Sequence, residues 1–354
     1  MRKRLFLGLA LTGLVLLAAA PTADSAPQTS SGFTIVASPR LRHTSYLTAV
    51  AAVSASDVWA IGSYWGGSRL MEHYNGSSWR VVTPPPLPHA RLDSISAHGS
   101  ALWVVGSCRV AEGWFGCVAR YTGSRWVRVA VPRQFSYNIG FHAVLAFSNT
   151  NVVVGEGEGP TQMIRWNGRG WSRVNDVPPH HTILGLAGTL SSHLFAVSYN
   201  VVEREQPDGS WLSDNLSNPD AYASGISASS AENAWVLSRW IDSAGNWHPL
   251  AMRWNGTTAT PVGVPSSPAS SYLTGVVTTR PNNTWAVGAR ATATDGSETL
   301  IEHYTGGSSF TELGAPDTAG QYNELAAIAA VPGSESDLWA VGQGNNQPLI
   351  LHHS

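Results

Sequence analysis

Asp93 and His142 are the two residues of this sequence whose types and positions best suit acid–base chemistry. Each immediately precedes a small residue, Ser94 or Ala143, at the same point of two successive copies of a repeated unit. If the copies lie side by side, His142 can act as a general base that Asp93 orients, with Arg91 close to both. A buried, hydrogen-bonded pair without chemistry explains the same residues, and we favour that interpretation.

Several aromatic residues fall outside the repeated columns and are candidates for ligand contact. Tryptophans that recur once per repeat are expected to be core, because tryptophan is highly buried on average. Off-pattern aromatic residues on loops are better placed to stack against a ligand such as a sugar ring. The candidates between the second and third strands of a unit are Trp65, Trp114, Trp240 and Trp247, and those at the loops leading into a first strand are Tyr46, Tyr222 and Tyr272.

Metal and cofactor chemistry finds no support in the sequence. His180 and His181 are adjacent, so in a strand they point to opposite faces and rarely reach one ion. Glu156 and Glu158 place two carboxylates on a glycine-rich loop, where calcium needs about six oxygen ligands. The chain also lacks Gly-x-Ser-x-Gly, His-Glu-x-x-His, a phosphate-binding glycine loop and a dinucleotide fingerprint. We therefore expect no metal and no cofactor, although a site assembled from single residues of several repeats would leave no linear motif.

A unit of four short strands repeats along the chain and must position these residues. Its first strand carries a small residue followed by a larger aliphatic one, and a glycine turn separates its third and fourth strands. The second-strand column, with members 40–54 residues apart, is Trp59, Trp103, Val153, Phe195, Trp235, Trp285 and Trp339. The third-strand column is His73, Arg120, Arg165, Arg204, Arg253, His303 and His352. We expect this charged column to be structural, with hydrogen bonds to turn carbonyls.

These repeats predict an all-β, seven-bladed β-propeller with four-stranded blades. The last unit stops after its third strand, whereas residues 33–39 match the fourth strand of other copies. We therefore expect the N-terminal strand to complete the last blade, which removes open sheet edges. The predicted organisation is a signal peptide over residues 1–25, a short disordered lead over 26–32 and a single propeller domain over 33–354.

The blade motifs resemble those of secreted bacterial seven-bladed propellers. Residues 54–62 follow the pattern Ser-x-x-Asp-x-Trp-Ala-Val-Gly with isoleucine for valine, and residues 73–79 read His-Tyr-Asn-Gly-Ser-Ser-Trp. The broader relatives are the kelch, galactose-oxidase and sialidase types of propeller. The aspartate of the sialidase Asp-box is replaced by Tyr74, and the kelch Gly-Gly doublet is missing. The resemblance covers residues 33–354 and implies the fold, but it carries over no activity.

The N-terminus and the cysteines indicate an exported protein. A basic Arg2–Arg4 precedes an apolar stretch over residues 5–20 and small residues near 25, which is typical of a secretory signal peptide. The apolar stretch is short for a membrane span of about 20 residues. The only cysteines, Cys108 and Cys117, flank a glycine-containing loop. After export they are expected to form a disulfide that pins a hairpin.

Charge and composition exclude some partners and favour others. The formal net charge is −2, and no basic run follows the predicted signal peptide, so neither nucleic acid nor an anionic membrane surface is an expected partner. We expect a secreted monomer that acts as a binding or interaction module. Its partner would be a glycan, a cell-envelope polymer or a protein, bound through the loop face. The alternative is a secreted carbohydrate-active enzyme, a polysaccharide lyase or glycosidase, with Asp93, His142 and Arg91 at the channel mouth.

Overall fold

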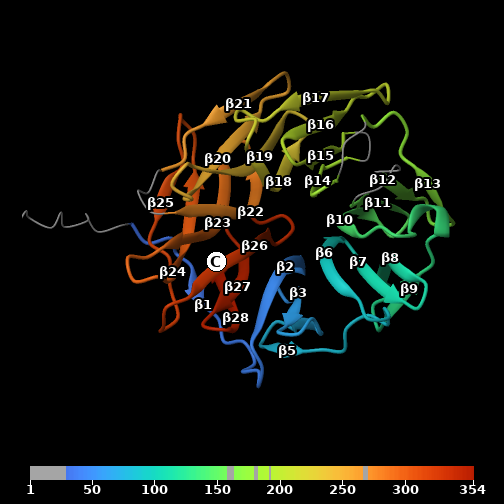
Figure 1. Cartoon of the computed structure of the whole chain (residues 1–354), viewed down its shortest axis with the longest axis horizontal. Coiled ribbons are helices and arrows are strands. Elements are labelled where there is room, and N and C mark those ends of the chain that lie inside the picture. The colour runs from blue at the N-terminus through green and yellow to red at the C-terminus, as the bar shows by residue number, and fades with distance from the viewer. Residues whose placement is uncertain (1–28, 158–162, 179–181, 191–192, 266–269) are drawn as a thin grey trace, which may run out of the picture.

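The computed structural model describes residues 29–157, 163–178, 182–190, 193–265 and 270–354. They form seven four-stranded antiparallel sheets arranged as the blades of a ring, with the fourth strands on the rim (Figure 1). The predicted all-β, seven-bladed propeller is thus confirmed. The single helical element among the described residues is a 3-10 turn, η1 (Arg133–Phe135). The predicted signal peptide, His180, His181 and Glu158 lie outside the described residues.

Each blade runs outward from its first strand, and the order is the same in every sheet. Blade 1 contains β2 (Ser45–Ser54), β3 (Asp57–Tyr64), β4 (Arg69–Tyr74) and β5 (Trp79–Val81). Blade 2 contains β6 (Arg91–His98), β7 (Ala101–Val110), β8 (Gly113–Tyr121) and β9 (Trp126–Val129). Blade 3 contains β10 (Phe141–Ser148), β11 (Asn151–Glu156), β12 (Met163–Trp166) and β13 (Trp171–Arg173). Blade 4 contains β14 (Gly185–Ala187), β15 (Phe195–Ser198), β16 (Val201–Glu205) and β17 (Trp211–Asn215).

The remaining blades follow the same order. Blade 5 contains β18 (Tyr222–Ser230), β19 (Asn233–Ile241), β20 (Trp247–Trp254) and β21 (Ala259–Val262). Blade 6 contains β22 (Ser271–Arg280), β23 (Asn283–Ala291), β24 (Ser297–Tyr304) and β25 (Thr311–Leu313). Blade 7 contains β26 (Asn323–Ala330), β27 (Leu338–Gly344), β28 (Gln347–His353) and, from the other end of the chain, β1 (Thr34–Ile35).

The ring is closed by the N-terminal strand, as the repeats predict. β1 pairs antiparallel with β28, and Thr34 lies opposite His352. The Val36 N–H extends this pairing by donating to the Ile350 carbonyl at 2.9 Å. The described part of the lead, residues 29–32, is also hydrogen-bonded, since the Ser31 N–H donates to the Gly314 carbonyl at 3.0 Å. Blade 7 therefore joins both ends of the repeat array.

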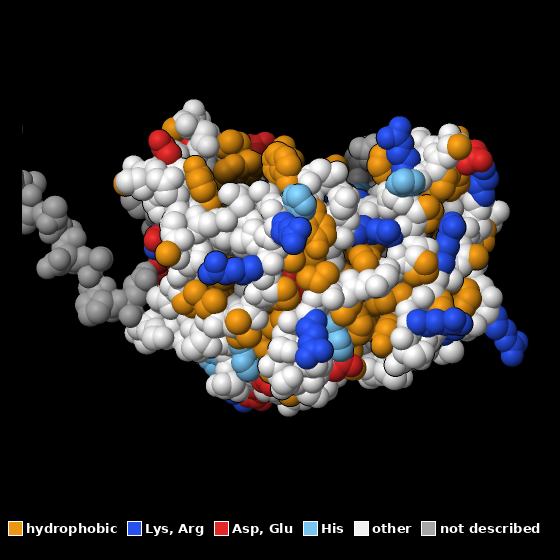
Figure 2. Space-filling view, turned by 90° about the horizontal axis from the view of Figure 1, so that it is seen from below, with side chains coloured by type: hydrophobic (Ala, Val, Ile, Leu, Met, Phe, Trp, Pro, Cys, Tyr) orange, Lys and Arg blue, Asp and Glu red, His pale blue; other side chains and the backbone are white. Residues whose placement is uncertain are grey.

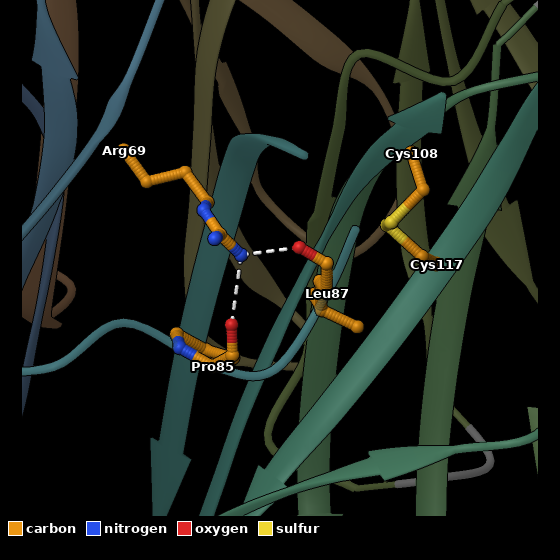
Figure 3. Close-up of a disulfide and its surroundings, with 5 residues drawn as sticks. All are labelled: Arg69, Pro85, Leu87, Cys108 and Cys117. Carbon is orange, nitrogen blue, oxygen red and sulfur yellow. Dashed lines mark hydrogen bonds between the residues drawn. A yellow bond between two sulfur atoms is a disulfide. The ribbon is translucent and has the colours of Figure 1, made fainter. Parts of the chain in front are cut away.

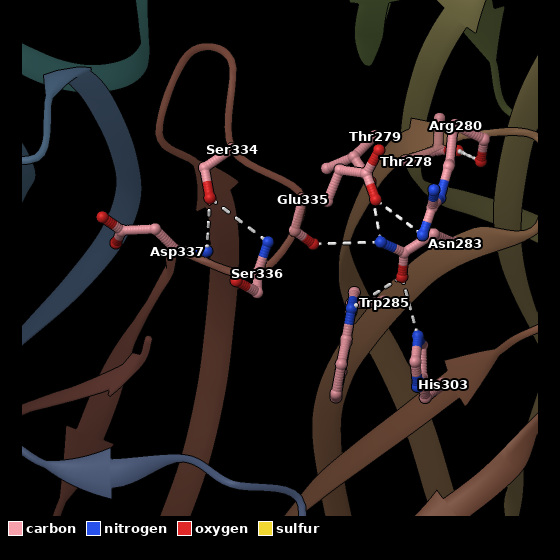
Figure 4. A network of polar contacts seen from close by, with 10 residues as sticks. All are labelled: Thr278, Thr279, Arg280, Asn283, Trp285, His303, Ser334, Glu335, Ser336 and Asp337. Atoms are coloured by element: carbon pink, nitrogen blue, oxygen red, sulfur yellow. Dashed lines mark hydrogen bonds and ion pairs between the residues drawn. The ribbon is translucent and has the colours of Figure 1, made fainter.

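The two repeated columns face each other across the second and third strands. Trp285, for example, lies directly opposite His303, and their rings stack with centroids 3.7 Å apart. Both rings donate to Asn283 Oδ1, from Trp285 Nε1 at 3.1 Å and from His303 Nε2 at 2.8 Å (Figure 4). Blade 1 repeats this arrangement with Asp57 as the acceptor. The histidines of the charged column thus have a structural role, as expected, but their acceptor is a side chain at the turn rather than a turn carbonyl.

The predicted disulfide joins Cys108 to Cys117 across the hairpin of β7 and β8, with their Cα atoms 5.8 Å apart. Both cysteines are buried in the core between blades 1 and 2, against Leu87. The nearby Arg69 donates to the carbonyls of Pro85 and Leu87 (Figure 3). The arginine therefore holds the segment that connects blade 1 to blade 2, and the crosslink secures the hairpin of blade 2 beside it.

A β-bulge recurs in the first strand of every blade except blade 4, at the position just before the small column. The bulge brings a first-strand carbonyl against the second strand. At Gly106 an added Cβ would lie 1.9 Å from the Arg91 carbonyl oxygen, so the second strand needs a glycine there. Bulges redirect a side chain from the usual alternation of a strand. Asp93 and His142 are the bulge residues of blades 2 and 3.

Candidate functional site

A hollow of about 510 Å³ opens on the face that carries the loops between blades and the turns between second and third strands. Blades 2, 3 and 4 and the loops between them supply its walls. The lining side chains are polar or aromatic for the most part, and acidic side chains are not among them. The lining residues are Arg91, Ser107, Trp114, Asn138, Ile139, Gly140, His142, Thr182, Leu184 and Tyr199.

Asp93 lies beneath this hollow and holds Arg91 over it. The carboxylate accepts a hydrogen bond from Arg91 Nε at 2.8 Å, and its side chain is only 7% exposed whereas that of Arg91 is 75% exposed. Burial raises the pKa of Asp93, and the charges of Arg91 and His142 and the Ser107 hydroxyl act in the opposite direction. The three candidate catalytic residues are therefore brought together, as the equivalent positions in neighbouring repeats suggested.

His142 is enclosed by the backbone of its own blade. Its half-buried imidazole lies beside Gly157, where an added Cβ would approach Nε2 to 2.7 Å. The Gly157 N–H donates to the Gly140 carbonyl at 2.7 Å, which holds the two glycines around the ring. The imidazole borders the hollow next to Arg91, so that a ligand there would meet two nitrogen donors from adjacent blades.

Aromatic rings stand on opposite sides of the hollow. Trp114, on β8, is 47% exposed, and Tyr199, in the turn between β15 and β16, is 40% exposed. The row continues to Tyr222, which is 50% exposed and whose ring centroid lies 6.3 Å from that of Tyr199. Trp114 and Tyr222 are predicted candidates, and Tyr199 connects them across the mouth of the ring.

The other aromatic candidates do not join this hollow. Arg239 lies over the rings of both Trp247 and Tyr272, at 4.8 and 5.3 Å from their centroids. The Tyr272 hydroxyl donates to Glu324 at 2.9 Å, and burial together with this carboxylate raises the pKa of Tyr272. Trp240 packs against His248. These rings are thus engaged within blades 5 to 7.

Trp65 and Tyr46 lie on blade 1, apart from both groups. Trp65 occupies the turn between β3 and β4 and is 79% exposed, more than any other large hydrophobic side chain among the described residues. Tyr46 is half-buried at the start of β2, the position that Arg91 and Tyr222 occupy in their own blades.

Several residues that line the hollow were not predicted from the sequence. Ser107 on β7 lies opposite Arg91 on β6. Pairing the second strand of blade 2 with the first would therefore have identified Ser107 from the sequence. Asn138 adopts a positive φ of 59° and donates its N–H to the Trp114 carbonyl at 2.8 Å, which no sequence pattern indicated. Tyr199 lies in blade 4, the blade whose repeat is most degenerate and whose first strand is shortest.

The described residues contain no group of three or more His, Cys, Asp and Glu side chains placed to hold a metal ion. None of the described helices is long and apolar enough to cross a membrane. Two further hollows, of about 460 and about 1,130 Å³, lie between adjacent blades at Trp59 and His73 and at Trp285 and His303. They border the stacked pairs that recur as structure, so we place the candidate site in the hollow of blades 2 to 4.

This arrangement can bind hydroxyl and anionic groups and can stack on a planar or ring-shaped ligand. Arg91, His142 and Asn138 supply polar groups, and Trp114 and Tyr199 supply ring faces. A proton transfer between His142 and a bound ligand is also chemically reasonable, because Asp93 lies close enough to His142 for their charges to interact.

No protein-family model matches the chain, and neither does any curated protein. Solved structures do resemble it. YCF48 from Cyanidioschyzon merolae is 14% identical with a TM-score of 0.61, covering 91% of this chain and 99% of that one. A YCF48 bound to D1 peptide is 13% identical with a TM-score of 0.58, covering 93% and 99%. Virginiamycin B lyase from Staphylococcus aureus with quinupristin is 11% identical with a TM-score of 0.62, covering 91% and 99%. At these identities the likeness shows the fold alone, and that fold is the seven-bladed β-propeller.

Proposed function

We propose that this protein is an extracellular binding module that recognises a glycan, a cell-envelope polymer or a protein through its loop face. One observation carries the proposal: the exposed tryptophans and tyrosines of the described residues all lie on that face. They lie in or directly beside a turn between second and third strands, or at the approach to or the start of a first strand. These residues are Trp65, Trp114, Tyr137, Tyr199, Tyr222 and Tyr322.

Aromatic side chains supply large, rigid contact area and are enriched in binding sites. A rigid ring of sheets with variable loops on one face also suits recognition, because loops carry function on a fixed scaffold. Structural neighbours include a propeller bound to a peptide and a lyase, which is compatible with binding but does not select it. The proposed export rests on the signal-like N-terminus.

The test is a binding panel of plant, algal and bacterial-wall polysaccharides and of peptides, with the wild-type protein and Trp114→Ala. Retention of the protein by one ligand, weakened by Trp114→Ala, would support a binding module. The matched control is Trp171→Ala, a change on the rim strand β13, which should leave the retention unchanged. No retention by any member of the panel would overturn the proposal.

An enzyme is the second candidate, because Asp93, Arg91 and His142 meet at the hollow. Incubation with the same polysaccharides, followed by size-resolved mass spectrometry, would reveal new chain ends if the protein cleaves a polymer. His142→Gln should then abolish product formation while binding persists. Intact polymers after long incubation would exclude a lyase or glycosidase acting on them.

A further inference from the structure

The charges on the loop face are unevenly distributed among the described residues. Loop positions of the first sector, before blade 3, carry exposed arginines, and the acidic residues there are Asp93 and Glu112. The arginines are Arg40, Arg42, Arg91, Arg109 and Arg133. Later loop positions are mainly acidic: Asp176, Asp220, Asp242, Asp295, Glu298, Asp317 and Glu324. Figure 2, which views the rim from the side where β5 lies in Figure 1, shows more basic than acidic side chains.

Two of these arginines are held above aromatic rings, one of which, that of Trp114, lines the hollow. The guanidinium of Arg133 lies 4.2 Å from the ring centroid of Tyr137, and that of Arg109 lies 5.7 Å from the ring centroid of Trp114. A guanidinium stacked on a ring keeps its N–H edges available for hydrogen bonds. Neither arginine forms an ion pair among the described residues, so each can offer a bidentate contact to a carboxylate.

Arg91, at the start of β6, adds a third guanidinium and lines the hollow with His142. Its Nε is bonded to Asp93, while most of the side chain faces solvent. Arg91 lines the hollow in which Trp114 and Tyr199 stand, and Arg109 lies over Trp114. Arg133 lines a smaller neighbouring hollow together with Phe115 and Ser136. Two guanidinium groups therefore lie over ring faces and a third lines the hollow, in a chain whose formal net charge is −2.

We propose that the ligand of this face is an acidic polysaccharide, whose uronate carboxylates pair with Arg91, Arg109 and Arg133 and whose sugar rings stack on Trp114 and Tyr199. This inference rests on the proposed binding function and names its ligand class. The neutral polar side chain of Asn138 suits sugar hydroxyls. An acidic peptide is less well matched, because bound peptides commonly add to a sheet edge, and here the edges are the rim strands.

The first experiment separates charge from ring stacking with three probes. Polygalacturonate presents carboxylates on sugar rings, its fully methyl-esterified form keeps the rings without charge, and poly-glutamate keeps the charge without rings. We expect binding to polygalacturonate that is at least about tenfold tighter than to either other probe, and that weakens as salt is raised. Equal affinity for the esterified polymer would overturn the role of charge, and equal affinity for poly-glutamate would make the ligand an acidic peptide.

The second experiment tests the site with the full-length protein. Arg109→Gln and Arg133→Gln together should weaken polygalacturonate binding by about tenfold or more, since each loses a charge-assisted contact. Arg80→Gln removes an equally exposed charge from β5, at the rim of blade 1, and should leave the affinity unchanged. An equal loss in both variants would mean non-specific attraction and would contradict the assignment.

The two proposals fail in different ways. One outcome is that the protein fails to bind polygalacturonate and still binds a neutral glycan or a peptide of the wider panel in a way that depends on Trp114. In that case the proposed binding function stands and the proposed acidic ligand is wrong. If no probe and no panel member is bound, both are wrong.

Discussion

At the scale of single residues, the second- and third-strand columns act as one packing unit. An Asp or Asn at the start of the second strand accepts two hydrogen bonds. One comes from the tryptophan two residues later, and the other from the histidine that lies opposite this tryptophan on the third strand, as Asp57 does for Trp59 and His73. Burial lowers the pKa of His303 to about 4, so this imidazole is neutral near pH 7 and donates its Nε2 proton to the Asn283 amide oxygen. The histidine in blade 6 is therefore a structural donor.

Replacing Asn283 by Ala should destabilise the protein by about 1–3 kcal/mol, because two ring N–H groups lose their shared acceptor in a buried site. Thermal or urea unfolding followed by tryptophan fluorescence measures the change. The neighbouring Asn282 is exposed, so Asn282→Ala serves as the control and should be nearly neutral. Equal stability of the two variants would show that the acceptor contributes little.

The residues of the site illustrate what sequence reasoning reaches and what it does not. Asp93 and His142 could be paired from the sequence because equivalent positions in adjacent repeats become neighbours in a propeller. Tyr199 could not, since its blade has lost most of the pattern. The engagement of Trp247 and Tyr272 by Arg239 was also hidden, because it depends on side-chain directions between blades 5 and 6.

At the scale of elements, the seven sheets differ in how their strands are secured. Blade 2 has a covalent link between β7 and β8, and blade 7 depends on the short β1. These elements were predictable, because spacing, turn glycines and strand order depend on local patterns that survive in most repeats. The bulge in the first strands was not predicted. It is a one-residue shift in the pairing of the first strand with the second, and that register cannot be read from the hydrophobic pattern of the first strand alone.

Removing the crosslink with Cys108→Ala/Cys117→Ala should lower the stability by about 2–3 kcal/mol, the entropy expected for a loop of this size, since the cysteines are 9 residues apart. Chemical unfolding under oxidising conditions measures the difference. Adding a reductant should lower the unfolding free energy of the wild-type protein toward that of the variant. If the reductant leaves the wild-type curve unchanged while the variant is less stable, the loss comes from packing around the cysteines and not from the crosslink.

Interrupting the closing strand with Val36→Pro should destabilise the whole ring by about 1–3 kcal/mol, because proline removes the N–H that donates to the Ile350 carbonyl. Val36→Ala keeps that N–H and is the matched control. Hydrogen exchange of blade 7 should rise in the proline variant first. Unchanged exchange there would mean that β1 contributes little to closure.

At the scale of the whole molecule, acidic side chains buried between blades couple stability to pH. Glu302 is fully buried on β24, on the side that carries Leu300 in the core between blades 5 and 6. Burial raises its pKa from the usual 4.5 to about 8, and the charge of the nearby Glu312 contributes to this rise. Its contribution to stability is therefore fully present below pH 4.5 and is lost as the pH rises to about 8.

Glu302→Gln should accordingly gain stability relative to the wild type as the pH is raised from about 5 to 9, by about 1.4 kcal/mol or more. Urea unfolding at several pH values measures this. The sign is diagnostic, because a variant that gains stability on acidification instead would show that the native carboxyl is ionised and favourably paired.

The closure of blade 7 also sets an order of events in time. The pair Thr34–His352 joins residues 318 positions apart, so the chain must make nearly all of its blades before this contact can form. Closing a loop of that length is entropically costly, and non-local pairing slows folding. Until then a nascent or refolding chain exposes the outer edge of β28 to other chains. A slow, concentration-sensitive final phase of refolding is the kinetic signature of a ring sealed by its own first strand.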